Sequence, residues 1–224
     1  MLRWSVILLI GVGVGAFASA GEPADLVEIR EYEVRADNRP VGRHTLKIHE
    51  RNGRTLVTMN SSIAVNILLY HYSFVFDARE IWDGESLLSV EARTNANGKR
   101  SLLKLKRNDE RALIQFQDQR TKIVPPEATN SYARMPPGME NHQAIRLLNL
   151  DDGTVAKTTW HAGENVKFRV DDRAVPCRKW VVEGDLQAEL WFDAGGWLVR
   201  QKTNEQGHPT ELRLISLAQE KTLP

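Results

Sequence analysis

The sequence predicts a mainly β protein built around one large antiparallel sheet. Apolar and polar residues alternate along most of the 224-residue chain, as expected of strands whose side chains point in turn to the two faces of a sheet. Turn residues recur at a spacing of roughly 8–12 positions. Because the segments between these turns contain no crossover helices, successive strands are expected to pair as antiparallel hairpins.

The strand that organises this prediction runs from Tyr70 to Trp82. Side chains two positions apart in a strand share a face, and one parity of this segment is rich in aromatic rings. The side chains of that parity include Tyr70, Tyr72, Phe74, Phe76, Glu80 and Trp82. We predict a central strand whose aromatic face forms the inner surface of the sheet.

Three strand-like segments joined by turns precede this strand. The alternation changes phase near Glu31, which indicates a β-bulge in the first segment. A turn over 36–40 leads into a strand over 41–50. Asn52-Gly53 is a strong hairpin signal, and a third strand over 54–65 follows it.

Hairpins continue after the aromatic strand. Asp83-Gly84 begins a turn, and Asn97-Gly98 belongs to a second hairpin loop. The strands predicted here cover 86–94, 99–107 and 112–117. The first of them is expected to direct Leu88, Val90 and Ala92 inward.

The strand pattern breaks between Val124 and Gly138, where four prolines cannot serve in a central sheet ladder. We predict a long loop over the sheet in this region. The segment Met139–Leu150 is predicted to be a helix, because its apolar residues form a short stripe at helical spacing. The residues of this stripe are Ala144, Ile145, Leu147 and Leu148.

Strands resume after Asp151-Asp152-Gly153 and continue to about Leu217, with turns at 162–165, 171–173 and 194–196. The total is about twelve strands, and open sheets of that size usually curl or split in two. The predicted fold is a single curved antiparallel sheet or partly open barrel, with the helix and the proline-rich loop against its concave side. A two-sheet β-sandwich is the alternative.

The first twenty residues have the features of a secretory signal peptide. Arg3 is their only charge, and the apolar run Val6–Ala18 is shorter than the roughly 20 residues that span a bilayer. Ala18-Ser19-Ala20 fits a signal-peptidase site. We predict cleavage following Ala20, a periplasmic or secreted protein, and one β domain over 21–224 without a membrane span. An uncleaved N-terminal anchor is the alternative.

Charge and cysteine content narrow the classes of function. The chain has 30 basic and 29 acidic residues, and loss of Arg3 leaves 29 of each. Such a balance argues against nucleic acid as a partner and against an electrostatic attraction to anionic membranes. Cys177 is the single cysteine, so it cannot form a disulfide within the chain and is expected to be a small buried hydrophobe.

Three segments occur together in a familiar order. The first is Arg79-Glu80-x-Trp82-x-Gly84 followed by Arg93-Thr94-Asn95-x-x-Gly98, the second is Leu147-Leu148-Asn149-x-x-x-Gly153, and the third begins at Val175-Pro176-Cys177-x-x-Trp180 and ends at Leu190-Trp191-Phe192-Asp193-x-x-Gly196-x-Leu198-Val199. In this order they resemble a bacterial family of exported β proteins catalogued only as a domain of unknown function. The resemblance covers roughly 29–217. It implies a curved antiparallel sheet, loosely similar to periplasmic lipoprotein carriers, and no established activity.

The aromatic face is the best candidate for a ligand-binding surface, because a concave sheet can hold an apolar ligand where side chains do not fill it. The predicted binding residues are Tyr70, Tyr72, Phe74, Phe76, Arg79, Glu80, Trp82 and Arg93. Glu80 has inward parity and must be paired or neutralised if it is buried. Arg79 and Arg93 would recognise an anionic headgroup. The alternative is an ordinary aromatic core with a solvated charged edge.

No motif assigns a reaction to the chain. The six histidines lack metal-binding spacing, and the sequence has no G-x-S-x-G, P-loop or dinucleotide fingerprint. Ser61 and Ser62 have no recognisable base near them in sequence. No catalytic residue, metal or cofactor is therefore predicted.

The preferred hypothesis is a non-enzymatic binding or carrier protein for an apolar or amphipathic small molecule. A structural or partner-binding protein of the cell envelope is the alternative, and it requires a packed interior with an exposed apolar patch. A hydrolase with Glu80 or Asp77 in a cavity is the third hypothesis, and it requires two converging acidic groups. The oligomeric state is left open.

Overall fold

The computed structural model describes residues 26–67, 70–108, 110–205 and 207–221. The predicted signal segment 1–20 and the first residues of the predicted domain lie outside this part, as does the side chain of Tyr70. Within the described part, no helix is long and apolar enough to cross a membrane.

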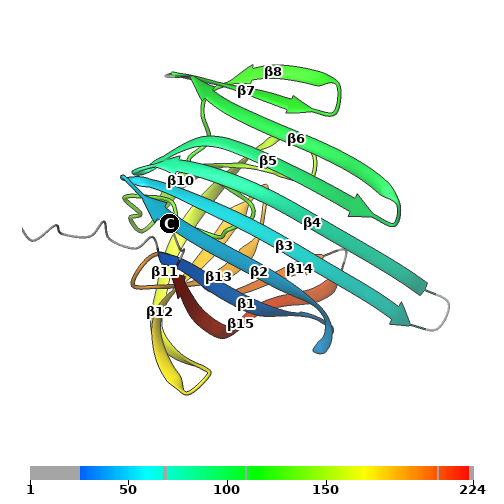
Figure 1. Ribbon diagram of the computed structural model, residues 1–224, viewed down its shortest axis with the longest axis vertical. Coiled ribbons are helices and arrows are strands. Elements are labelled where there is room, and N and C mark those ends of the chain that lie inside the picture. Colours follow the sequence, from blue (N-terminus) through cyan, green and yellow to red (C-terminus); the bar gives the residue numbers. More distant parts are fainter. Residues whose placement is uncertain (1–25, 68–69, 109, 206, 222–224) are drawn as a thin grey trace, which may run out of the picture.

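Fifteen strands form one sheet in the described part of the chain (Figure 1). The strands of the first half are β1 (Leu26–Ala36), β2 (Arg39–Arg51), β3 (Arg54–Ile67), β4 (Tyr70–Asp83), β5 (Ser86–Ala96), β6 (Lys99–Asn108), β7 (Arg111–Phe116) and β8 (Gln119–Ile123). The strands of the second half are β9 (Ala128–Thr129), β10 (Gln143–Leu148), β11 (Val155–Val170), β12 (Arg173–Gly184), β13 (Ala188–Asp193), β14 (Leu198–Glu205) and β15 (His208–Lys221).

The strand order is β8-β7-β6-β5-β4-β3-β2-β1-β15-β14-β13-β12-β11-β10-β9. Each neighbouring pair is antiparallel except β9 and β10, which are parallel. The first and last strands therefore pair in the middle of the sheet, and β8 and β9 form its two edges. Figure 1 shows the sheet curving so that its first half faces its second half. This continuous order confirms the single curved antiparallel sheet and excludes the two-sheet sandwich.

The number of strands and the helix are corrections to the sequence analysis. β8, β9 and β10 add to the predicted strands, whereas the expected turn at 162–165 is a bulge inside the single strand β11. The predicted helix Met139–Leu150 is wrong: its centre is the strand β10. Ile145 and Leu147 are buried on one parity of that strand. So short an apolar run fits the helical period of 3.6 residues as well as the strand period of two.

Local turn signals place the hairpins correctly. Asn52 and Gly53 have φ values of 51° and 75°, as a type I′ hairpin turn requires. The predicted bulge after Glu31 is present as a register shift between β1 and β15. A second bulge, at Trp82, sets that residue opposite Leu87, so Leu87 is buried in place of the expected Leu88.

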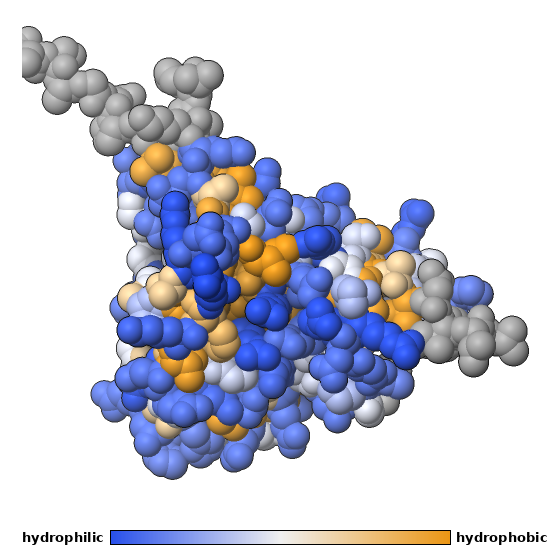
Figure 2. All heavy atoms as spheres, turned by 90° about the horizontal axis from the view of Figure 1, so that it is seen from below, coloured by the Kyte–Doolittle hydropathy of each residue, from blue (hydrophilic) through white to orange (hydrophobic). Residues whose placement is uncertain are grey.

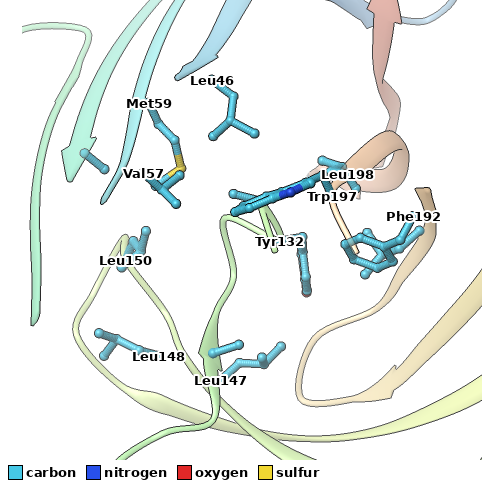
Figure 3. Close-up of a cluster of buried hydrophobic side chains, with 14 of the residues drawn as sticks. Leu46, Val57, Met59, Tyr132, Leu147, Leu148, Leu150, Phe192, Trp197 and Leu198 are labelled. Atoms are coloured by element: carbon cyan, nitrogen blue, oxygen red, sulfur yellow. The ribbon is translucent and has the colours of Figure 1, made fainter. Parts of the chain in front are cut away.

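Residues 124–142, here called the plug, link the two halves of the sheet. The amide of Met135 donates to the carbonyl of Gly196 at 2.8 Å, and the amide of Leu198 donates to the carbonyl of Ala133 at 3.1 Å. Figure 3 shows Tyr132 of the plug in one cluster with Trp197 and with core residues of β2, β3 and β10. The proline-rich loop therefore occupies the interior of the curved sheet and is not merely laid over it.

Candidate functional site

The inward side chains of β4 become more exposed along the strand. Trp82 and Glu80 are each 1% exposed, Phe76 is 9% exposed, and Phe74 and Tyr72 are half-buried. All of them share the inward face, as their parity predicts. The interior is therefore closed at the Trp82 end of β4 and open at the Tyr72 end.

Four half-buried apolar side chains lie together at the open end, and we call them the open patch. Phe74 and Tyr72 of β4 are register partners of Ile63 and Val65 of β3. The rings of Tyr72 and Phe74 stack with centroids 6.5 Å apart, and Phe76 continues the stack at 6.3 Å. Figure 2 shows apolar atoms exposed toward the end of the β3–β4 hairpin, at the right of the view.

Glu80 lies at the closed end and is bound by three donors. The indole Nε1 of Trp82 donates to Oε2 at 3.0 Å, while the hydroxyls of Thr129 and Ser131 donate to Oε1 at 2.6 and 3.0 Å. Burial raises the pKa of the Glu80 carboxyl, against the lowering by these donors and by Arg134. Glu80 is thus a contact between the sheet and the plug, not an exposed ligand-binding group.

Arg134 of the plug reinforces this contact. Its guanidinium lies 5.1 Å from the ring centroid of Trp82 and 5.8 Å from that of Trp197. Its Nη1 also donates to the carbonyl of Gly84 at 3.0 Å. One side chain therefore bridges β4, the turn after it and the turn before β14.

Arg79 and Arg93 are not brought to the open patch. Both are exposed on the outer face of the sheet, and Arg93 forms an ion pair of 2.6 Å with Glu91. Glu80 faces Val90 across the hairpin, and Arg93 faces Asp77. The structure therefore separates the predicted residues into an inner group and two outer arginines.

The structure places a base beside Ser61. His44 of β2 is its register partner, and His44 Nδ1 lies 2.6 Å from Ser61 Oγ. Burial lowers the pKa of His44 to about 4, so the imidazole is neutral at pH 7 and can accept the hydroxyl proton in a hydrogen bond. Since Ser61 also faces Phe76 on β4, this polar pair lies next to the open patch.

Other titratable groups have local roles in the described part of the chain. His142 and His161 share a hydrogen bond of 2.9 Å between their Nδ1 atoms, and His161 Nε2 lies 3.3 Å from Glu183. No group of three or more His, Cys, Asp or Glu among the described residues is placed to hold a metal ion. Cys177 is buried as expected, and burial raises the pKa of its thiol to about 12, which makes it unreactive.

Two depressions in the described surface are open to solvent and lie away from the open patch. One, of about 510 Å³, is lined by β12, β13 and β14 and includes Glu183 and Lys202. The other, of about 280 Å³, lies between Leu87 and Pro126 of the plug. The described residues thus define a barrel-like protein with a plugged interior and an open apolar end.

The comparisons agree with this class of protein. Residues 32–215 match the model of a family described as "Domain of unknown function (DUF6134)", so the chain belongs to that family. The fold is similar to that of a beta-barrel-like protein of domain of unknown function DUF1849 from Brucella abortus, with a TM-score of 0.63 and 10% identity over 89% of this chain and 99% of that one. No curated protein matches. At this identity the likeness concerns the fold alone.

Proposed function

We propose that this chain is a non-enzymatic binding protein that holds the apolar part of an amphipathic small molecule on its open patch. The observation that supports this most is the half-burial of Ile63, Val65, Tyr72 and Phe74, side by side on an inward face that the plug does not fill. Contiguous exposed apolar surface of this kind marks binding sites. The ligand would lie in the open end of the barrel.

The polar part of such a ligand has a partner close by. The Ser61 hydroxyl and the neutral His44 imidazole adjoin the aromatic stack. They offer a hydrogen-bonding group but no net charge, which suits a carboxylic acid, ester or hydroxyl headgroup. The proposal includes export after cleavage following Ala20, based on the sequence features of residues 1–20.

The test is a titration with a fluorescent long-chain fatty acid. Phe74→Ser removes a large apolar contact, and burial of such a side chain is equivalent to roughly a tenfold or larger change in affinity. Val75→Ser is the matched control, because Val75 is the next residue of the same strand and lies 44% exposed on the opposite face. Equal weakening by both variants, or no binding by the wild type, would contradict the proposal.

A partner-binding protein of the cell envelope is the second candidate, and the filled interior favours it. The plug occupies the space in which an enclosed ligand would lie, and the open patch could contact a protein instead. A photo-crosslinking amino acid at Tyr72 separates the two candidates by whether the adduct is a lipid or a polypeptide. The hydrolase hypothesis has less support, because Asp77 is exposed on the outer face whereas Glu80 is buried on the inner one.

A further inference from the structure

The near-zero net charge of the chain conceals an uneven distribution. Between Arg93 and Lys122 the sequence has nine basic residues and three acidic ones. This stretch forms most of the β5–β8 end of the sheet, which lies at the top of Figure 1. The net charge of the whole chain therefore does not describe the charge at the β5–β8 end of the sheet.

The strand register gathers five of these cations on the outer face. Lys104 and Arg120 face Gln115 from either side, while Lys106 and Lys122 face Leu113 from either side. Arg111 follows on the same parity of β7. At the spacing of strands in a sheet, the five side chains start within roughly 15 Å of one another. We call Lys104, Lys106, Arg111, Arg120 and Lys122, with Leu113 among them, the basic face.

These five cations are exposed and have no acidic partner among the described residues. Glu91, the register partner of Lys104, forms its ion pair with Arg93 instead. Leu113 is 40% exposed in the middle of the group. A sheet face with clustered cations around an exposed apolar side chain has the composition of a membrane-surface site.

Protection of the sheet edge does not account for the whole group. Charged residues on an edge strand prevent strands of other molecules from pairing with it, and this explains Arg120 and Lys122 of β8. Lys104 and Lys106 lie on β6, two strands away from the edge. The concentration of all five cations on one face therefore indicates an anionic partner.

We propose that the basic face docks on the anionic surface of a phospholipid bilayer, with Leu113 entering the headgroup region. Nucleic acid fits the face less well, because a leucine lies at its centre and no described side chain of the group is aromatic and able to stack on bases. The proposal does not depend on the open patch, which is on the other face of the sheet. It would bring the open patch close to a source of amphipathic molecules.

The experiment is co-sedimentation with vesicles of phosphatidylcholine, with and without phosphatidylglycerol. Binding is expected to require phosphatidylglycerol and to fall as salt screens the charges. Each Lys or Arg near an anionic surface strengthens binding about fivefold, so the triple variant Lys104→Gln, Lys106→Gln, Lys122→Gln should bind about a hundredfold more weakly. Leu113→Thr, which changes no charge, should weaken binding several-fold.

The matched control removes the same charge from another exposed surface, by Arg43→Gln, Lys47→Gln and Arg54→Gln on β2 and β3. Its binding should stay within about threefold of the wild type. All variants keep the same N-terminal residues, whose effect therefore cancels, and circular dichroism verifies their folding. Equal losses in both triple variants, binding independent of phosphatidylglycerol, or tighter binding to a DNA duplex than to the vesicles would overturn the proposal.

Discussion

At the scale of single residues, Glu80 has the most constrained environment in the interior. A buried carboxylate is stabilised only where donors and nearby positive charge replace its water. The sheet supplies one donor, Trp82, and the plug supplies Thr129, Ser131 and the nearby Arg134. Glu80 therefore stabilises the plug in its position rather than contacting a ligand.

Substitution of Glu80 tests this role. Because the folded state raises the Glu80 pKa above 4.5, the stability that this carboxyl contributes is present below pH 4.5 and is lost as the pH rises through the folded pKa. Glu80→Gln removes the charge. Its amide oxygen can still accept from Trp82 while its NH2 group donates to the rotated hydroxyls of Thr129 and Ser131, so its unfolding free energy should equal or exceed that of the wild type at pH 8. Glu80→Ala should cost about 3 kcal/mol through unsatisfied donors and a cavity. Urea titrations at pH 5 and pH 8 measure both, and a Gln variant as unstable as the Ala variant would contradict the argument.

His44 provides a pH dependence of the opposite sign. Its pKa is about 4 in the folded state and 6.5 when unperturbed, so stability is full above pH 6.5 and is lost as the pH falls from 6.5 to 4. The loss is about 3 kcal/mol, at roughly 1.4 kcal/mol per pKa unit. In the same urea titrations, His44→Gln should lose less unfolding free energy than the wild type between pH 6.5 and pH 4. The other titrating groups are common to both proteins, so their contribution cancels in the difference. If the unfolding free energies of the two proteins depended on pH in the same way, His44 would not titrate as proposed.

At the scale of elements, the plug decides what kind of site the sheet can form. It closes the interior around Glu80 and leaves the open patch at the other end. Arg134 contacts two tryptophan rings and one carbonyl, so it holds the plug against both halves of the sheet. The fold itself depends on the strand ladders rather than on this side chain.

Arg134→Ala should loosen the plug without unfolding the sheet. The expected loss in unfolding free energy is about 1–2 kcal/mol, the scale of partly buried cation–π contacts. Cleavage by chymotrypsin after Tyr132 should become faster, while the far-ultraviolet circular dichroism is unchanged. Arg169→Ala is the control, since Arg169 is exposed and its one ion pair among the described residues is with an exposed aspartate on the same hairpin. Unchanged proteolysis in Arg134→Ala would show that other contacts fix the plug.

Elements with local signals could be predicted from the sequence, and those fixed by distant contacts could not. The Asn52-Gly53 turn and the bulge at Glu31 depend on neighbouring residues and are confirmed. The turn at Asn52-Gly53 also implies that Ser61 lies opposite His44, a signal that could have revealed this pair. The sequence predicts a helix at the position of β10, because β10 is a strand through its pairing with β9 and β11 and no local pattern shows those partners.

The candidate site follows the same division. The parity of β4 predicts that Tyr72, Phe74, Phe76, Glu80 and Trp82 share the inward face. It also sets Arg79 and Arg93 on the outer face once the register is known. The partners of Glu80 on the plug could not be found, since they are 49 and 51 residues away in the chain with no motif joining them.

At the scale of the whole molecule, the first and last described strands form the centre of the sheet. β1 pairs with β15 along its whole length, although the two strands are the first and last of the described fold. Arg30 of β1 reaches Asp193 at 2.6 Å and the Leu198 carbonyl at 3.2 Å, and the Tyr32 hydroxyl donates to that carbonyl at 2.7 Å. We call the β1–β15 pairing, with these contacts of Arg30 and Tyr32, the seam. The two halves of the sheet cannot separate without breaking it.

Hydrogen exchange should show this arrangement directly. Because β1 and β15 are central, their amides should exchange only on global unfolding, whereas those of the edge strand β8 exchange by local opening. Leu214→Ala and Ile114→Ala remove similarly buried side chains, 2% and 3% exposed, and each should cost about 2–5 kcal/mol. Leu214→Ala at the β1–β15 pairing should speed exchange of the amides that open only on global unfolding, including those of β1 and β15, and leave the local opening of β8 unchanged. Ile114→Ala on β7 should speed exchange in β6, β7 and β8 as well. Slower exchange in β8 than in β1 would contradict the role of the seam, because it would make the β5–β8 end the last part of the molecule to open.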